Sequence, residues 1–96
     1  MTANDVSLDE RPQRQDGVLA QQAQGQTVLL RLRDGGYYAL DEVGARIWEL
    51  CDGQRAVAEV VAALCAEFEA PAATIRADAL EFIGDLRRER LLVVGA

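Results

Sequence analysis

The side chains that most often carry out chemistry in proteins are scarce in this sequence. It has no histidine and no lysine, so that all ten basic residues are arginine, and its single serine is Ser7. A serine–histidine–aspartate triad, a cysteine–histidine pair, a Schiff-base lysine and a histidine-ligated metal ion are therefore impossible within these residues. Carboxylates are present, but none forms an obvious acid–base pair within an apolar pocket. We expect a protein that is not an enzyme and that holds no cofactor and no metal ion.

The two cysteines, Cys51 and Cys65, each lie within an apolar pattern of helical period. A disulfide is uncommon in the cytoplasm, and two thiols without histidine make a poor metal site. We expect both cysteines to be reduced and to pack in the core as small apolar groups.

A different chemistry, hydrogen bonding through the main chain, is open to the stretch GYYALDEVGARIWEL at residues 36–50. Its short aromatic strand, residues 37–40, is followed by a helix with almost no loop between them. The strand has no proline, lysine or inward-pointing charge, which are the usual means of blocking a sheet edge. An unprotected edge can accept a strand from another peptide. The alternative is that Tyr37 and Tyr38 pack as ordinary strand aromatics, one on each face.

Three antiparallel strands are predicted at residues 18–22, 27–33 and 37–40. Gly25 marks the first turn, and Asp34-Gly35 predicts a type I′ hairpin, in which both central residues need a positive φ. The middle strand alternates, with one apolar face and one polar face, and only Leu29 breaks the alternation; the apolar face holds Val28, Leu30 and Leu32.

Three helices are expected after the strands. Asp41 is a good N-cap for a helix over residues 42–51, and Gly53 is suited to end it in the left-handed conformation. The second helix follows Ala56, where a serine or threonine cap would be about 1 kcal/mol more stable. Pro71 is predicted as the first residue of a third helix that ends near three arginines. Residues 91–94 form either a terminal strand or a plug over the core.

Three strands followed by three helices predict a winged-helix-like α+β fold. We expect residues 1–16 to be a flexible polar tail and residues 17–96 to be the folded domain. The N-terminus has no signal-peptide character, and no apolar run approaches the ~20 residues needed to cross a bilayer. The prediction is a cytoplasmic protein without a membrane partner.

Because winged-helix domains often bind DNA, that function is the alternative to peptide binding. Residues 17–96 hold 12 acidic side chains and eight arginines, for a net charge of −4. The third helix carries equal numbers of acidic and basic side chains between Ile75 and Arg90. Nucleic-acid phosphates require a cationic surface, so the charge disfavours a DNA-binding or transcriptional regulatory module.

Three segments in fixed order, YYALDEVGARIWELCDG, VAEVVAALCAEF and IRADALEFIGDL, followed by Leu91-Leu92, resemble the PqqD-like family of recognition domains in ribosomal-peptide biosynthesis. The shared features are an aromatic strand that ends in Leu-Asp, a glycine-containing first helix that closes at Asp-Gly, a second helix rich in valine and alanine, and Ile-x-x-Asp at the start of the third. The resemblance covers most of residues 18–92.

The resemblance implies a non-catalytic adaptor that binds the leader of a precursor peptide and presents the peptide to a modifying enzyme, either a radical SAM enzyme or a leader peptidase. It implies that the leader adds as an antiparallel strand beside residues 37–40, in a groove closed by the third helix. The leader-binding residues carried over by position are Gly36, Tyr37, Tyr38, Ala39, Leu40, Asp78, Ala79, Phe82, Asp85 and Leu86.

Three of these residues keep two interpretations. Phe82 and Leu86 either line apolar pockets of the groove or belong to the core. Asp78 either pairs with a cationic leader residue or only faces solvent.

Overall fold

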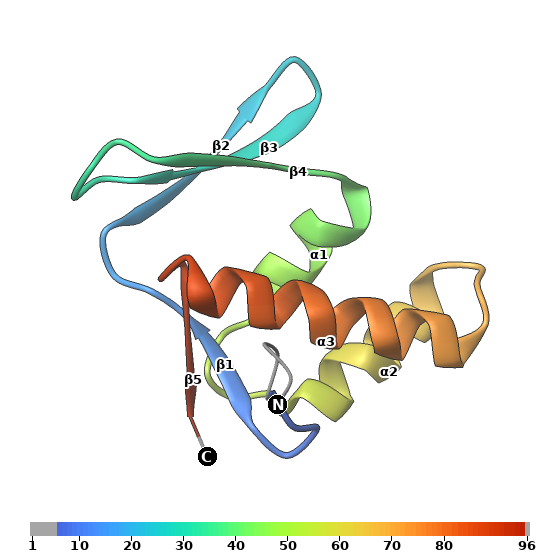
Figure 1. Cartoon of the computed structure of the whole chain (residues 1–96). Helices are drawn as coiled ribbons and strands as arrows, with labels where there is room; N and C mark the ends of the chain where they lie inside the picture. Colours follow the sequence, from blue (N-terminus) through green and yellow to red (C-terminus); the bar gives the residue numbers. More distant parts are fainter. Residues whose placement is uncertain (1–5, 96) are drawn as a thin grey trace.

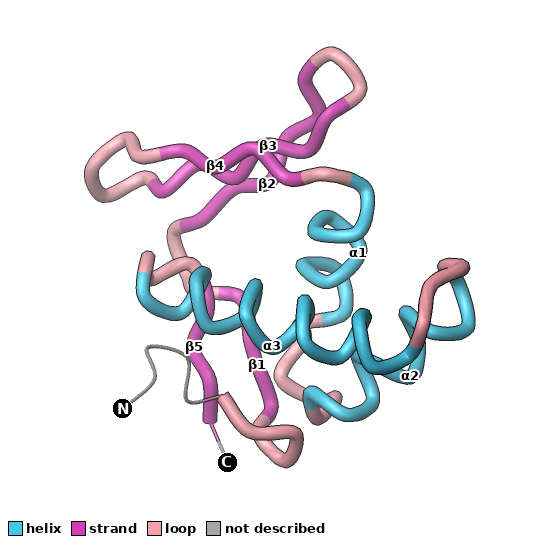
Figure 2. The backbone as a smooth tube through the Cα atoms, turned by 45° about the vertical axis from the view of Figure 1, so that its right-hand side comes forward, coloured by secondary structure: helices cyan, strands magenta, loops and turns pink. Residues whose placement is uncertain are grey.

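The computed structural model describes residues 6–95, which form a three-stranded sheet, three helices and a two-stranded ribbon (Figure 1). The three-stranded sheet lies on one side of α3 and the ribbon on the other, a separation that is also visible in Figure 2. This arrangement confirms the predicted α+β fold with a three-stranded antiparallel sheet followed by three helices. In chain order the elements are β1 Arg11–Arg14, β2 Val18–Ala23, β3 Gln26–Arg31, β4 Tyr37–Leu40, α1 Glu42–Leu50, α2 Val57–Glu67, α3 Ala72–Arg88 and β5 Leu92–Gly95.

Of the two hairpins of the β2–β3–β4 sheet, the first turns at Gly25 as predicted and the second differs from the prediction. The type I′ geometry occurs at Gln24-Gly25, where φ is 54° and 81°. At the second hairpin β3 ends at Arg31, and only Gly35 has a positive φ, at 75°. The prediction of a type I′ turn at Asp34-Gly35 is wrong, because Asp34 accepts hydrogen bonds from the Gly36 N–H and the Arg31 Nε and so holds a wider loop.

The inner face of this sheet is set by the residue that breaks the alternation of the sequence. Leu29 is fully buried and lies opposite Tyr38, and Leu40 at the end of β4 is 3% exposed. Leu32, by contrast, is 56% exposed at the outer end of the hairpin. The core therefore lies on the side of Leu29 and Leu40, and the outer face of the sheet also carries apolar side chains.

The segment predicted as a flexible tail belongs to the folded body over the part that the structure describes. Arg11 to Arg14 form β1, which pairs antiparallel with β5, and Pro12 is fully buried. The folded body thus begins before residue 17, while residues 1–5 of the expected tail lie outside the described residues. Residues 92–95 take the strand form, not the plug form, of the predicted C-terminal segment.

The N-terminal segment also caps α2, which explains how that helix starts at an alanine. The Val57 N–H donates to the Glu10 carbonyl over 2.8 Å, and the Ala58 N–H donates to the Leu8 carbonyl over 3.0 Å. Two of the amides that lack a partner within the helix are therefore satisfied by distant backbone. Since Ala56 has no acceptor side chain, these bonds replace the missing side-chain cap.

The other helix ends follow the sequence closely. Asp41 is the N-cap of α1, and its carboxylate accepts from the Gly44 N–H over 2.7 Å, as predicted. Gly53 has the expected positive φ of 79°, but it lies two positions after the C-cap Cys51, so it is not the residue that ends α1. Pro71 lies one position earlier than predicted, as the N-cap of α3, where its lack of an N–H is equally harmless.

All three helices contribute to one core, whose largest fully buried side chains include Ile47, Leu64 and Ile83. Cys51 is fully buried there, and burial raises the pKa of its thiol to about 12. Cys65 is half-buried, and neither cysteine forms a disulfide within the described chain. None of the helices between residues 6 and 95 has the length and apolar character needed to cross a membrane.

The packing of the N-terminal segment is testable at Val6, which is 8% exposed and contacts the core. We expect Val6→Ala to lower the free energy of unfolding by about 1–2 kcal/mol, because it removes methyl groups from a packed site. The exposed neighbour Ser7 is the control, and Ser7→Ala should change stability by less than about 0.5 kcal/mol. Urea unfolding measures both, and an unchanged Val6→Ala protein would show that this segment does not pack on the core.

Candidate functional site

The outer edge of β4 is unpaired within the described residues, and the C-terminal strand β5 pairs with β1 instead of covering it. Within residues 6–95 the strand order of the larger sheet is β2-β3-β4, so β4 has a neighbour on one side only. The Arg31 N–H donates to the Gly36 carbonyl over 2.7 Å and so fixes the alternation of the β3–β4 ladder. It follows that Tyr38 and Leu40 direct their N–H and C=O groups toward β3, while Tyr37 and Ala39 direct theirs to the open edge.

Two hollows of opposite charge lie along α3, one near each end of β4. The hollow near the end of β4 has a volume of about 320 Å³, and we call it the acidic hollow; it is lined by Asp41, Val43, Gly44, Ile47, Asp78, Glu81, Phe82 and Asp85. The hollow near the start of β4 has a volume of about 270 Å³, and we call it the basic hollow; it is lined by Arg31, Arg33, Asp34, Arg88, Glu89 and Arg90. We refer to the β4 edge and these two hollows together as the β4–α3 groove.

The apolar part of the acidic hollow depends on a close approach between α1 and α3. A Cβ atom on the buried Gly44 would lie 3.0 Å from the Phe82 Cζ, so a larger residue there would press on the ring. Phe82 is half-buried, with part of its ring against the core and part lining the hollow. The groove thus contains an apolar surface surrounded by four carboxylates.

The opposite end of the groove is held by Arg31. Its Nε donates to the Asp34 carboxylate over 2.8 Å, and its Nη1 donates to the backbone carbonyl of Glu89 at the end of α3. The Arg31 guanidinium and the Gly36 N–H together hold the pKa of Asp34 below its usual range. One side chain therefore ties the β3–β4 loop to the C-terminal end of the helix.

Tyr38 lies between these two ends. Its pKa is raised by burial, by a hydrogen bond with Glu89 and by the negative charges of Glu89 and Asp85. The phenol is therefore protonated at neutral pH and remains a hydrogen-bond donor.

The structure divides the predicted site residues into three groups. Asp78, Phe82 and Asp85 line the acidic hollow. Ala79 and Leu86 are 0% and 1% exposed, so their side chains belong to the core and do not line either hollow.

The third group is the strand residues 36–40, whose side chains lie in different places. Gly36 to Leu40 supply the backbone of the open edge, but the Leu40 side chain is buried. Tyr37 is 75% exposed, and because it lies opposite Leu30 its side chain is on the outer face of the sheet. Tyr38 is thus the tyrosine that faces α3.

Apart from Asp78 and Asp85, the polar residues that form the ends of the groove were not predicted from the sequence. Arg31 has the same parity as the buried Leu29, which is the signal that its side chain points inward. Gly44 within a helix was a second signal, since glycine there usually marks close packing. The sequence contains no comparable signal that Glu81 and Arg90 lie at the site. No group of three or more potential metal ligands occurs among residues 6–95.

An open strand edge beside a helix is the arrangement by which small recognition domains bind peptides through strand addition, and the described residues have it. The family model described as "Coenzyme PQQ synthesis protein D (PqqD)" matches residues 26–92, and this chain belongs to that family. The resemblance noted in the sequence is confirmed.

Curated relatives support the same assignment along nearly the whole chain. A protein of Xanthomonas axonopodis pv. citri (strain 306) named "PqqA binding protein" is 33% identical over 87 residues, which is 91% of this chain and 95% of that protein. A protein of the same name from Xanthomonas oryzae pv. oryzae (strain KACC10331 / KXO85) is 32% identical over 87 residues, again 91% of this chain and 95% of that protein.

Two solved structures are similar in fold and sequence. TbiB1 in complex with the TbiA(beta) leader peptide is 35% identical, with a TM-score of 0.74 over 83% of this chain and 93% of that one. The PqqD truncation of Methylobacterium extorquens PqqCD, described as a RiPP recognition element, is 25% identical, with a TM-score of 0.79 over 97% of this chain and 99% of that one.

Proposed function

We propose that this protein binds the leader of a ribosomally synthesised precursor peptide and presents that peptide to a modifying enzyme, without catalysing a reaction itself. The observation that carries the proposal is the open β4 edge, with an acidic, partly apolar hollow near its end and a basic hollow near its start, both lined by residues of α3 or its C-terminal end. Support comes from the TbiB1 structure, which was solved with a leader peptide, and from the relatives named for PqqA binding.

In the proposed complex the leader forms a fourth strand of the sheet, antiparallel to β4. The outward N–H and C=O groups of Tyr37 and Ala39 supply the main-chain hydrogen bonds. Phe82 supplies an apolar contact, and Asp78 and Asp85 favour a cationic residue of the leader. Side chains give the specificity, while backbone bonding gives affinity that does not depend on sequence.

The proposal is compatible with either of two partner enzymes, a radical SAM enzyme or a leader peptidase. Both act on peptides made on ribosomes, which is consistent with a cytoplasmic site of action. The competing function, DNA binding, is disfavoured by the acidic side chains that α3 presents to the groove: Asp78, Glu81 and Asp85.

The proposal is tested by titrating the protein with fluorescein-labelled TbiA(beta) leader, labelled PqqA and labelled random duplex DNA at ~0.15 M salt. We expect at least one peptide to bind with a Kd of about 10 μM or tighter, and the DNA not to bind in that range. Binding to DNA alone would contradict the proposal. Competition by unlabelled peptide excludes binding to the dye.

Strand addition predicts a specific effect of proline at Ala39. Because the Ala39 N–H points to the open edge, Ala39→Pro should leave the β3–β4 hydrogen bonds in place while it removes one bond to the leader. We expect leader affinity to fall about tenfold or more, because the ring also crowds the incoming strand. Ala39→Ser keeps the N–H and should bind like the parent protein. A proline variant that is folded by circular dichroism and binds normally would show that the leader docks elsewhere.

The role of Phe82 in leader binding can be separated from its role in core packing by comparison with Phe68, the other phenylalanine of the chain. Phe82 and Phe68 are both half-buried against the core, but only Phe82 lines the acidic hollow. We expect both alanine variants to lose about 1–3 kcal/mol of unfolding free energy. Only Phe82→Ala should also weaken leader binding, by about tenfold, measured by fluorescence anisotropy at a temperature where both variants are folded. Equal losses of affinity in the two variants would show that Phe82 acts through stability alone.

A further inference from the structure

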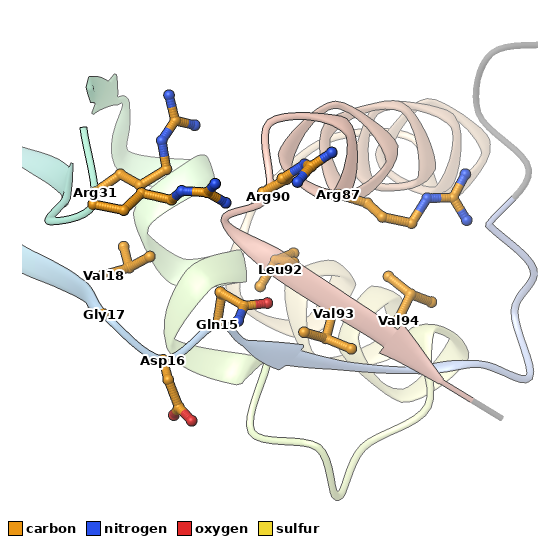
Figure 3. Close-up of a pocket in the computed structure, with 11 residues that line it drawn as sticks. Gln15, Asp16, Gly17, Val18, Arg31, Arg87, Arg90, Leu92, Val93 and Val94 are labelled. Atoms are coloured by element: carbon orange, nitrogen blue, oxygen red, sulfur yellow. The ribbon is translucent and has the colours of Figure 1, made fainter. Parts of the chain in front are cut away.

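A cavity lined by arginines lies beyond the basic hollow, around the C-terminal end of α3 (Figure 3). Its volume is about 500 Å³, and its apolar part is formed by Val18 and β5. Four arginines line it, with a single acidic residue, Asp16, in a protein whose net charge is −6. We call it the arginine cavity; its arginines are Arg31, Arg33, Arg87 and Arg90.

The positive charge of this cavity is only partly neutralised by the protein. Arg31 pairs with Asp34, but Arg33, Arg87 and Arg90 have no ion pair within 4.0 Å among the described residues. In Figure 3 the Asp16 carboxylate points away from the arginines. Like charges gathered in this way repel one another unless an anion lies between them.

Arg90 is held in this cluster by an unusual backbone conformation. It follows α3 at the position after the C-cap with a φ of 61°, where glycine is the usual residue. The Arg90 N–H donates to the Arg87 carbonyl and the Leu91 N–H donates to the Leu86 carbonyl, which is the pattern of a Schellman motif. An arginine at this position is a local cost to stability, and observed strain of this kind is a pointer to function.

The arginine cavity continues the β4–α3 groove. It shares Arg31, Arg33 and Arg90 with the basic hollow, so the two have a common wall. A strand antiparallel to β4 has its N-terminal end near Leu40 and the acidic hollow. Its C-terminal end arrives at Gly36, beside the basic hollow, and the chain that follows reaches the arginine cavity next.

We propose that the arginine cavity binds carboxylates of an acidic segment of the precursor peptide that follows the strand-forming part of the leader. Guanidinium groups bind carboxylates through paired, charge-assisted hydrogen bonds, so several arginines around one cavity suit glutamate and aspartate side chains. Together with the acidic hollow, the cavity selects peptides whose charge changes from positive to negative along the chain. The proposal rests on the proposed function and adds a second contact region and a direction to it.

The test uses the TbiA(beta) leader extended at its C-terminus by a ten-residue Gly-Ser linker and then by four glutamates or four glutamines. Such a linker spans about 16–19 Å on average, which lets the tail sample the end of α3. We expect the glutamate tail to tighten binding about five- to tenfold over the glutamine tail at ~50 mM salt, and less than twofold at ~500 mM. The same glutamate tail at the N-terminus, beside the acidic hollow, should give no gain.

A pair of double variants identifies the cavity as the source of the gain. Arg33→Gln with Arg90→Gly removes two cavity arginines and relieves the positive φ, so the variant should be folded and melt at the same or a higher temperature. In this variant the glutamate-tailed and glutamine-tailed peptides should bind with equal affinity. Because the gain is the ratio of these two affinities in the same variant, any change in binding of the strand-forming part of the leader does not affect it. Arg55→Gln with Arg76→Gln removes the same charge outside the cavity and should retain the gain.

The outcomes separate this inference from the proposed function. If the glutamine-tailed peptide binds but the glutamate tail adds nothing, the arginine cavity is not a carboxylate site, and leader binding stands. A gain that survives Arg33→Gln with Arg90→Gly also overturns the inference. If neither peptide binds, the proposed function itself fails, and the inference fails with it.

Discussion

The antiparallel pairing of β1 with β5 is the constraint on which the rest of the structure depends. It holds the first and last strands of the described chain together, from Arg11 opposite Gly95 to Arg14 opposite Leu92. With β5 in this ribbon, the C-terminal strand does not cover β4, and the outward N–H and C=O groups of β4 have no partner within residues 6–95. The same N-terminal segment satisfies the first amides of α2. A sequence that looks like a loose tail therefore supports both the helical core and the open edge.

The groove between β4 and α3 is fixed at its two ends by contacts of different kinds. At the acidic end, the absence of a side chain on Gly44 lets Phe82 approach α1, so the geometry depends on packing. At the basic end, Arg31 joins the β3–β4 loop to the last turn of α3 through Asp34 and the Glu89 carbonyl. An arrangement held at both ends costs little entropy when a peptide strand enters it, because the receiving edge is already formed.

Much of the fold could be predicted from the sequence, because local signals agreed with it. The Asp41 cap, the positive φ of Gly53 and the helical periods are local properties, and the structure has them. β1 could not be predicted, because two of its four residues are arginine and its partner strand lies at the other end of the chain. For the site, the helical period places Ala79, Phe82 and Leu86 on one face of the third helix. Which of these side chains reaches the groove depends on tertiary packing, which the period does not show.

The ribbon of β1 and β5 lies on the opposite side of α3 from the three-stranded sheet (Figure 1). β5 ends there at Gly95, opposite Arg11, so polypeptide attached after β5 would leave from that side of the molecule, remote from β4. A catalytic domain fused or tethered at that side would not obstruct an entering strand. The topology therefore allows the same recognition domain to work as a separate protein or as a module of a larger enzyme.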